Sequence, residues 1–394
     1  MQKKINHLPF LFLMGLLLAC SDLANVSMGA FTLKLAYLGF LAYFIIFLYS
    51  YGLKFNRKNA YISMALIFSF IPSLIFSYNI KTSAVFFIGT MMCIIIMLIF
   101  AKMSAALGSQ TISLLVIFYR ISILLSILLV LAGVQNRAHF ILYEPSYYAI
   151  ALIPYYCIVF YRLFHEGWKF SLLDIIFILA IIVFSQSFSM ALWCLLSFLI
   201  VYLTSGKAKL FHVLGIIFLF LLVIYVIANF HERTAKILKA FFTVLDDPSK
   251  YLNLFVLIGG NRLQRVMIAY DAFLMHPVFG IGIGALREYS TENFKLDSFD
   301  LDGLSASDFS TEMNATNVFM EVMAEAGIIG LVGFLVVLVF VARKKSNMGI
   351  FLALKISFFV TMISLLIESS YLRPYVWALY GIVIGLSSRT EEKN

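Results

Sequence analysis

Two arginines and a histidine mark the most polar part of an otherwise apolar chain. The stretch from Asn261 to Gly284 reads NRLQRVMIAYDAFLMHPVFGIGIG. Its first half predicts a short amphipathic helix with Asn261 as N-cap, and Arg262 and Arg265 share a face of the first turn. Two guanidiniums beside the positive end of a helix dipole suit the binding of a phosphate or diphosphate. The alternative is an interfacial helix whose arginines contact lipid headgroups.

A glycine-rich loop follows this predicted helix. The residue before a proline is disfavoured in the α region, so His276-Pro277 predicts the end of the helix. Gly280, Gly282 and Gly284 alternate in FGIGIG. Because glycine has no Cβ, these positions would let a ligand approach the backbone closely.

A second polar stretch, QNRAHFILYEPS, connects two apolar runs and contains Arg137, His139, Tyr143 and Glu144. Glu144 before Pro145 also fits the start of a helix. A carboxylate, two histidines and several arginines on one membrane face suit general-base chemistry beside an anionic leaving group. The chain has no Ser-His-Asp order, Walker loop, HExxH motif or paired metal ligands, so we expect no cofactor and no metal.

Polar residues also lie inside apolar runs. Asn317, Glu321 and Glu325 are spaced by four, so they share one helix face, which we expect to face protein or a wet cavity rather than lipid. Arg120 and Asp174 also lie within apolar runs, where charges are costly. They are either functional charges or a structural ion pair.

The elements that position these residues are membrane helices. Hydrophobic residues make up 62% of the chain and charged residues 12%, which excludes a soluble globular protein. Gly327 and Gly330 would allow close helix packing. The four cysteines all fall in apolar runs, which argues against a disulfide framework or a metal cluster.

Hydropathy predicts an all-α, polytopic membrane protein with about 12 spans. The spans are Leu8 to Ala24, Phe31 to Tyr51, Ala60 to Tyr78, Ala84 to Lys102, Ile112 to Gly133, Tyr147 to Phe164, Ser171 to Gln186, Phe188 to Ser205, Leu210 to Asn229, Thr316 to Val341, Gly349 to Ile367 and Pro374 to Ser387. This predicts a membrane segment at 1–229, a long loop at 230–315 and a second membrane segment at 316–394. The N-terminal stretch ending at Cys20 resembles a lipoprotein signal, and we treat it as an uncleaved first span.

Lys and Arg concentrate in alternate connections, which predicts that both termini are cytoplasmic and that the long loop is extracytoplasmic. The opposite short connections hold only Lys81, Arg137 and Arg373. The loop has eight basic and eleven acidic residues, net −3, whereas the remaining 21 basic and nine acidic residues give +12. The basic charge therefore suits cytoplasmic turns on anionic lipid and not a nucleic acid.

Two further features are expected in the long loop. Arg233 to Leu245 has the spacing of a helix lying on the membrane. The acidic tract from Glu288 to Glu312 predicts a loop or lid. A calcium site is the alternative, although the acidic spacing matches no EF-hand.

Four motifs together resemble the O-antigen polymerase and ligase superfamily, the Wzy-type enzymes. They are YEPSYYA, GNRLQR, HPVFGIGIGAL and TNVFMEVMAEAGIIGLVGFL, and the resemblance covers roughly residues 135 to 341. It implies a GT-C-like fold in the bacterial inner membrane. It also implies glycosyl transfer from undecaprenyl diphosphate on the periplasmic face, without a nucleotide sugar or a metal.

The resemblance also implies roles for individual residues. Arg262 and Arg265 match the arginines that hold the diphosphate, His276 with the following glycines matches the HPxxGxGxG loop, and the opening of the next span matches at Asn317, Glu325, Gly327 and Gly330. Many members have a histidine close to that asparagine, whereas Asn314 and Thr316 stand here. The acceptor's base would then be Glu144, His139 or His276, unless the leaving diphosphate makes a strong base unnecessary.

We therefore expect a polymerase that transfers a growing glycan to another lipid-linked repeat unit. The alternatives are a ligase to lipid A core and a polysaccharide flippase or transporter; the chain lacks the internal repeats usual in transporters. Expected partners are the lipid-linked oligosaccharide, membrane lipids and a chain-length regulator. The expected catalytic residues are Arg262, Arg265, His276 and Glu144, and the expected substrate-binding residues are Arg137, His139, Gly280, Gly282, Asn317 and Glu321.

Overall fold

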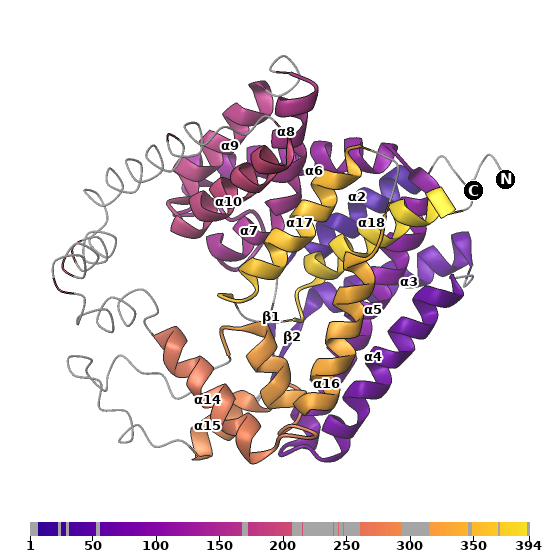
Figure 1. Ribbon diagram of the computed structural model, residues 1–394, viewed down its shortest axis with the longest axis vertical. Coiled ribbons are helices and arrows are strands. Elements are labelled where there is room, and N and C mark those ends of the chain that lie inside the picture. Colours follow the sequence, from indigo (N-terminus) through magenta and orange to yellow (C-terminus); the bar gives the residue numbers. More distant parts are fainter. Residues whose placement is uncertain are drawn as a thin grey trace.

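Helices make up nearly all of the described elements in the computed structural model (Figure 1). The structure describes residues 7–22, 25–28, 31–52, 56–167, 172–206, 261–293, 315–345, 349–368 and 371–391, and the single positions 215, 239, 243 and 247. At 25–28, 31–36, 261–264 and 388–391 it describes the backbone alone. Apart from those single positions, the predicted ninth span, Leu210 to Asn229, and the predicted helix from Arg233 to Leu245 lie outside the described residues, as does most of the acidic tract.

The first part of the chain forms five helices and a strand pair. The helices are α2 (Leu8–Ala19), α3 (Leu35–Tyr51), α4 (Arg57–Ile75), α5 (Ile80–Leu107) and α6 (Gln110–Leu131). Strands β1 (Asn25–Met28) and β2 (Phe31–Lys34) pair antiparallel, with Asn25 opposite Lys34.

The remaining helices fall into two sets. The first set is α7 (Pro145–Ala151), α8 (Ile153–His165), α9 (Leu172–Ser185) and α10 (Phe188–Thr204), and α7 and α8 are bent by 47° relative to each other. The second set is α14 (Asn261–Met275), α15 (Leu286–Asn293), α16 (Val318–Ala342), α17 (Phe351–Ser364) and α18 (Pro374–Glu391).

The strand pair corrects the predicted second span. That span was expected to begin at Phe31, whereas the helix begins at Leu35 because Phe31–Lys34 pairs with β1. Phe31 and Thr32 favour the extended backbone more than the helix, which accounts for the late start. The first helix likewise ends at Ala19, before the polar Ser21 and Asp22.

The structure supports a polytopic membrane protein, but not the count of twelve spans. By length and composition, four described helices could cross a membrane: Arg57–Ile75, Ile80–Leu107, Gln110–Leu131 and Val318–Ala342. The bent pair α7 and α8 would make a fifth. The other apolar helices among the described residues have only 10–17 residues.

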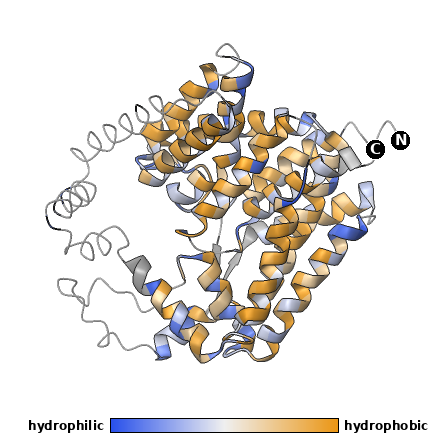
Figure 2. Ribbon diagram, in the orientation of Figure 1, coloured by the Kyte–Doolittle hydropathy of each residue, from blue (hydrophilic) through white to orange (hydrophobic). Residues whose placement is uncertain are grey.

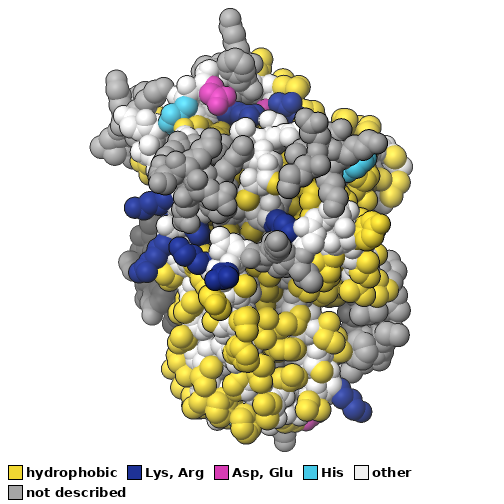
Figure 3. Space-filling model, turned by 90° about the vertical axis from the view of Figure 1, so that its right-hand side faces the viewer, with side chains coloured by type: hydrophobic (Ala, Val, Ile, Leu, Met, Phe, Trp, Pro, Cys, Tyr) yellow, Lys and Arg dark blue, Asp and Glu magenta, His cyan; other side chains and the backbone are white. Residues whose placement is uncertain are grey.

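The surface and the interior both suit an apolar surrounding. Figure 2 shows apolar residues along most helices and more hydrophilic ones in α14 and α15. The side of the molecule that carries α4 is broadly apolar, with Lys and Arg gathered mainly above that surface (Figure 3). On α4, the exposed side chains include Tyr61, Met64 and Phe68.

Small residues bring two helix pairs into close contact. α18 packs along α5, where a Cβ at Gly381 or Gly385 would collide with the carbonyl oxygens of Met97 and Ala101. α16 packs along α4, with Gly333 against Ser69. Helices in a membrane gain much of their association from such close backbone approach. The first and last parts of the chain therefore pack together, although their division into the predicted domains stays a prediction.

Two contacts tie helix ends to neighbouring parts of the chain. The end of α2 meets the start of α18, where Arg373 lies 3.5 Å from Asp22. On the opposite side, the Lys102 ammonium donates to the carbonyl oxygens of Tyr51 and Gly52, both at 2.8 Å, and so satisfies the end of α3. Which group of ends faces the periplasm stays a prediction.

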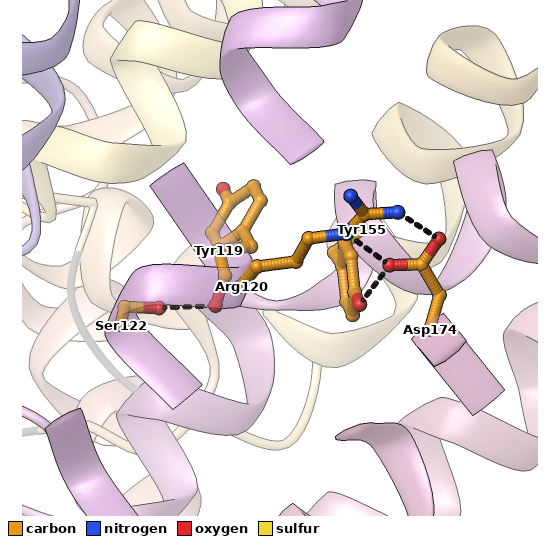
Figure 4. Close-up of polar contacts among 5 residues, drawn as sticks. All are labelled: Tyr119, Arg120, Ser122, Tyr155 and Asp174. Carbon is orange, nitrogen blue, oxygen red and sulfur yellow. Dashed lines mark hydrogen bonds and ion pairs between the residues drawn. The ribbon is translucent and has the colours of Figure 1, made fainter. Parts of the chain in front are cut away.

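Arg120 and Asp174 form an ion pair between α6 and α9 (Figure 4). The guanidinium donates from Nε to Oδ1 at 2.6 Å and from Nη2 to Oδ2 at 2.8 Å. The Tyr155 hydroxyl of α8 donates to the same Oδ1 at 2.7 Å. Asp174 is fully buried, so the predicted alternative of a structural pair is the one that the structure supports.

We predict that Asp174→Ala lowers the free energy of unfolding by about 3 kcal/mol, because it leaves a partly buried guanidinium without its carboxylate. Denaturant titration in detergent measures the change. The double variant Arg120→Leu with Asp174→Leu is the control and should recover most of the loss, since it removes both charges. An Asp174→Ala protein as stable as the wild type would contradict this role for the pair.

Candidate functional site

Helix α16 is broken at Gly327, whose φ of 63° lies outside the helical region. The loop after α14 packs into this break. Ile281 N–H donates to the Ala324 carbonyl at 2.9 Å, and Gly282 N–H donates to the Glu325 carbonyl at 3.0 Å. Beyond the break, Ile328 N–H donates to the Pro277 carbonyl at 2.9 Å. The loop therefore provides hydrogen-bond partners for the interrupted helix.

The loop glycines make close contact with the protein itself. A Cβ on Gly280 (φ 72°) would lie 2.6 Å from the Ala326 nitrogen and would collide with the Glu325 backbone. Reciprocally, a Cβ on Gly327 would collide with the Val278 carbonyl. Gly282 is equally enclosed, by side chains at the α4–α5 turn. The substrate-binding role of Gly280 and Gly282 stays a prediction, because the close approach seen here is with protein.

The side chain of Glu325 also binds the glycine-rich loop. It is 2% exposed, and its carboxylate accepts from the backbone N–H groups of Gly284 and Leu286 and from the Tyr371 hydroxyl at 3.2 Å. Burial raises the pKa of Tyr371, so the phenol stays protonated as a donor. Glu325 thus ties the glycine loop and the start of α15 to the turn before α18.

The other two members of the predicted polar face also lie against protein. The Asn317 side chain caps α16 by accepting from the backbone N–H groups of Phe319 at 2.9 Å and Met320 at 3.2 Å. Glu321 is only 6% exposed. The expectation that this face avoids lipid is therefore confirmed for both glutamates.

Helix α14 lies against the first segment of α16. Ile268, Ala269 and Ala272 bury their side chains in one cluster with Ala324. The helix ends at Met275, as His276-Pro277 predicts. At its start, Asn261 and Arg262 are described by their backbone only. Asn261 was predicted as the N-cap, but it is the first residue of the helix, which therefore begins one residue earlier than predicted.

The predicted chemistry-bearing residues of α14 stand at opposite ends of the helix. Arg265 is partly buried near its start. His276 is exposed just after its end, with its ring 5.9 Å from that of Tyr289. The structure therefore does not group His276 with the arginines.

The predicted base Glu144 is exposed and precedes α7, which begins at Pro145 as the sequence predicts. Its Oε2 accepts from the Ser146 hydroxyl at 3.2 Å. The loop before it is tied down, because Asp22 accepts from Tyr143 N–H at 3.4 Å and Asp22 N–H donates to the Ile141 carbonyl at 2.9 Å. Glu144 is thus an exposed carboxylate on an anchored loop.

Arg137 and His139 lie earlier in the same loop. Arg137 is exposed, and the Nδ1 of the half-buried His139 is hydrogen-bonded to the Leu142 carbonyl. Their proposed contacts with substrate stay predictions. The contact that the structure shows for His139 holds the loop.

A buried group of charges, which we name the Arg373 cluster, lies where the ends of α2 and α17 meet the starts of α7, α16 and α18. The Arg373 guanidinium lies 3.5 Å from the Asp22 carboxylate and 3.5 Å above the Tyr147 ring. Glu321 interacts electrostatically with Arg373, and Glu368 with Tyr147. The cluster comprises Asp22, Tyr147, Glu321, Glu368 and Arg373.

The Arg373 cluster joins a predicted residue to several that sequence reasoning missed. Glu321 was expected at the site, and Glu144 acts on Tyr147 electrostatically from three residues away. Asp22 and Glu368 were not singled out, and Arg373 served only to assign topology. The available signal was that Arg373 is one of the few basic residues in the connections on its side.

Comparison with known proteins identifies one family. A sequence model described as O-antigen ligase matches residues 173–335. No individual curated protein matches the chain. The matched range includes α14, the glycine loop and the break in α16, and it confirms the resemblance to the O-antigen polymerase and ligase superfamily.

We predict that Gly280→Ala prevents stable folding, because a methyl group would collide with the α16 backbone at the break. Gly133→Ala is the matched control. Gly133 has a similar φ of 71° but open space around it, so alanine there should cost only about 1–2 kcal/mol. Folded yield and melting temperature in detergent provide the measurement. Equal loss in both variants would mean that the collision has no effect of its own.

Proposed function

The match over residues 173–335 identifies the chain as a relative of the O-antigen polymerase and ligase superfamily, and from this premise we propose that it polymerises a surface polysaccharide. The donor would be a glycan on undecaprenyl diphosphate, and the acceptor another lipid-linked repeat unit. The reaction would take place on the periplasmic face of the bacterial inner membrane, with both termini in the cytoplasm.

The observation that supports this proposal most is the content of the matched range. It includes the α14 helix with Arg262 and Arg265, and the loop that docks into α16. Because this loop meets α16 at Gly327 and α14 packs against the first segment of α16, the start of α14 should point towards the Asn317 end. Arg265 would then lie on the same side of the break as Glu321.

In the proposed reaction, an acceptor hydroxyl displaces the diphosphate at the anomeric carbon of the donor glycan. The bond between that carbon and the diphosphate oxygen breaks, and a new carbon–oxygen bond forms to the acceptor. Arg262 and Arg265 would stabilise the negative charge that develops on the departing diphosphate. Glu144 would accept the hydroxyl proton. An anchored loop suits this role, because positioning of the reacting groups lowers the barrier.

Polymerase is preferred to ligase on two sequence features. The motif Glu144-Pro145-Ser146 and the absence of a histidine beside Asn317 favour the polymerase. A ligase would transfer the glycan to lipid A core, and a flippase would move the lipid-linked unit without glycosyl transfer. These rivals differ in the product that accumulates.

We predict that Arg265→Ala and Arg262→Ala abolish chain extension while the protein remains in the membrane. The test uses a strain that lacks its own polymerase and supplies the matching repeat-unit pathway, with the surface glycan separated on a gel. The wild type should give a ladder and each variant a single repeat, because the leaving diphosphate loses its counter-charge.

Lys81→Ala is the control, since Lys81 is an exposed cation on the same predicted side, at the start of α5. It should give a normal ladder at equal expression. A wild type that leaves only single repeats would exclude the polymerase. Accumulation of the lipid-linked unit on the cytoplasmic side without the protein would favour the flippase instead.

A further inference from the structure

We propose that the Arg373 cluster, with the exposed Tyr143 and Glu144 beside it, binds the hydroxyl-rich terminal sugar of the acceptor glycan. This inference rests on the proposed polymerase, and it assigns the acceptor to a place separate from the arginines of α14. The ligand class is a neutral pyranose with free hydroxyl groups. It follows from the hydrogen bonding of Arg373, the charge of the cluster and the exposure of its rim.

Arg373 is a buried cation with unused hydrogen-bonding capacity. A guanidinium has five N–H donors. The hydrogen bond from Nη1 to Asp22 is long, at 3.5 Å, and the buried Nε has no hydrogen-bond partner within the part of the chain that the structure describes. A buried donor left without a partner is destabilising. Donors in this state favour a ligand that brings oxygen acceptors.

The charge of the cluster selects among such ligands. The carboxylates of Asp22 and Glu321 act on the guanidinium and that of Glu368 acts on the adjoining Tyr147, and each of these residues is buried or nearly so. Buried carboxylates beside the guanidinium disfavour an added anion such as a diphosphate. A sugar is different, because its hydroxyl oxygens accept from the arginine while its hydroxyl protons are donated to carboxylates.

The carboxylates are also poorly arranged for a cation. Among the described residues, no three His, Cys, Asp or Glu side chains lie close enough together to hold a metal ion. The arrangement is therefore that of separate hydrogen-bonding groups around a guanidinium, as a polyhydroxyl ring requires.

The rim of the cluster offers an aromatic surface and a proton acceptor. The Tyr143 side chain is 68% exposed, while its backbone N–H is held by Asp22 at 3.4 Å. A pyranose ring can lie on the face of such a tyrosine. Glu144 is the adjacent exposed residue. A sugar between Tyr143 and Arg373 would thus place a hydroxyl near the carboxylate proposed to accept its proton.

The competing explanation is that Arg373 serves only to join α18 to α2. That role would need the ion pair with Asp22 and the Tyr147 contact. It would not use the exposed Tyr143 or the Nε, which has no hydrogen-bond partner among the described residues. The two explanations differ in what soluble ligands the protein binds.

The test measures binding of two soluble probes to purified full-length protein in detergent. One probe is the free repeat-unit oligosaccharide, without lipid or phosphate, and the other is farnesyl diphosphate. Arg373→Gln should reduce oligosaccharide affinity at least tenfold and leave diphosphate binding unchanged, and Arg373→Lys should restore part of the affinity. Arg265→Ala should have the opposite effect, losing the diphosphate and keeping the oligosaccharide.

Tyr143→Ala keeps the test decisive if Arg373→Gln fails to fold, because an exposed side chain can be removed without loss of packing. It should also reduce oligosaccharide affinity about tenfold. Tyr49→Ala is its matched control, since Tyr49 is 92% exposed on α3. Wild-type affinity in Tyr143→Ala, or in a folded Arg373→Gln, overturns the inference. If the wild type gives a normal ladder in that experiment, the proposed polymerase function still holds although the sugar site does not.

Discussion

The break in α16 is the constraint on which the surrounding structure depends. At membrane depth there is no water to satisfy backbone groups, so a helix can leave its regular path only where protein supplies the missing hydrogen bonds. The loop from Pro277 to Gly282 supplies them, and Glu325 fixes the next part of that loop through its carboxylate. The position of α14 follows from this docking, because α14 leads directly into the loop.

The same side of the bundle contains the Arg373 cluster. Its residues lie at the ends of several helices and do not form one sequence motif. Asp22, Tyr147, Glu321, Glu368 and Arg373 come from five different helix ends. Glu321 belongs both to this cluster and to the helix segment on which α14 lies. In the proposed mechanism, this shared segment holds the binding site of the donor's diphosphate and the binding site of the acceptor's sugar in a fixed position relative to each other.

Local pattern was sufficient for much of the fold. Apolar runs indicated where most of the described helices lie, Pro145 and Pro277 indicated where helices begin or end, and the spacing of Glu321 and Glu325 indicated a buried face. The helix α15 was not expected, because the tract from Glu288 was predicted to be a loop or lid. Hydropathy could not recognise that Phe31–Lys34 pairs as a strand, because that choice depends on a partner segment. Nor could it count spans, since several apolar helices are short.

The candidate site was harder to predict, for a similar reason. An arginine in a short turn has the same local sequence whether it is solvated or buried, and the partners of Arg373 are more than 200 residues away, at Asp22 and Tyr147. For the glycines, the sequence indicated the kind of contact but not the partner. FGIGIG indicated a close backbone approach, but sequence alone could not say that the approaching groups are the α16 backbone at Gly280 and side chains of the α4–α5 region at Gly282 and Gly284.

The ion pair between Arg120 and Asp174 has a consequence for the order in which the protein is made. The two residues are 54 positions apart, so at about 5–20 residues per second the ribosome supplies the carboxylate several seconds after the guanidinium. During that interval α6 contains a charge that the bilayer disfavours. The carboxylate that offsets this charge is therefore present only once α9 has been made.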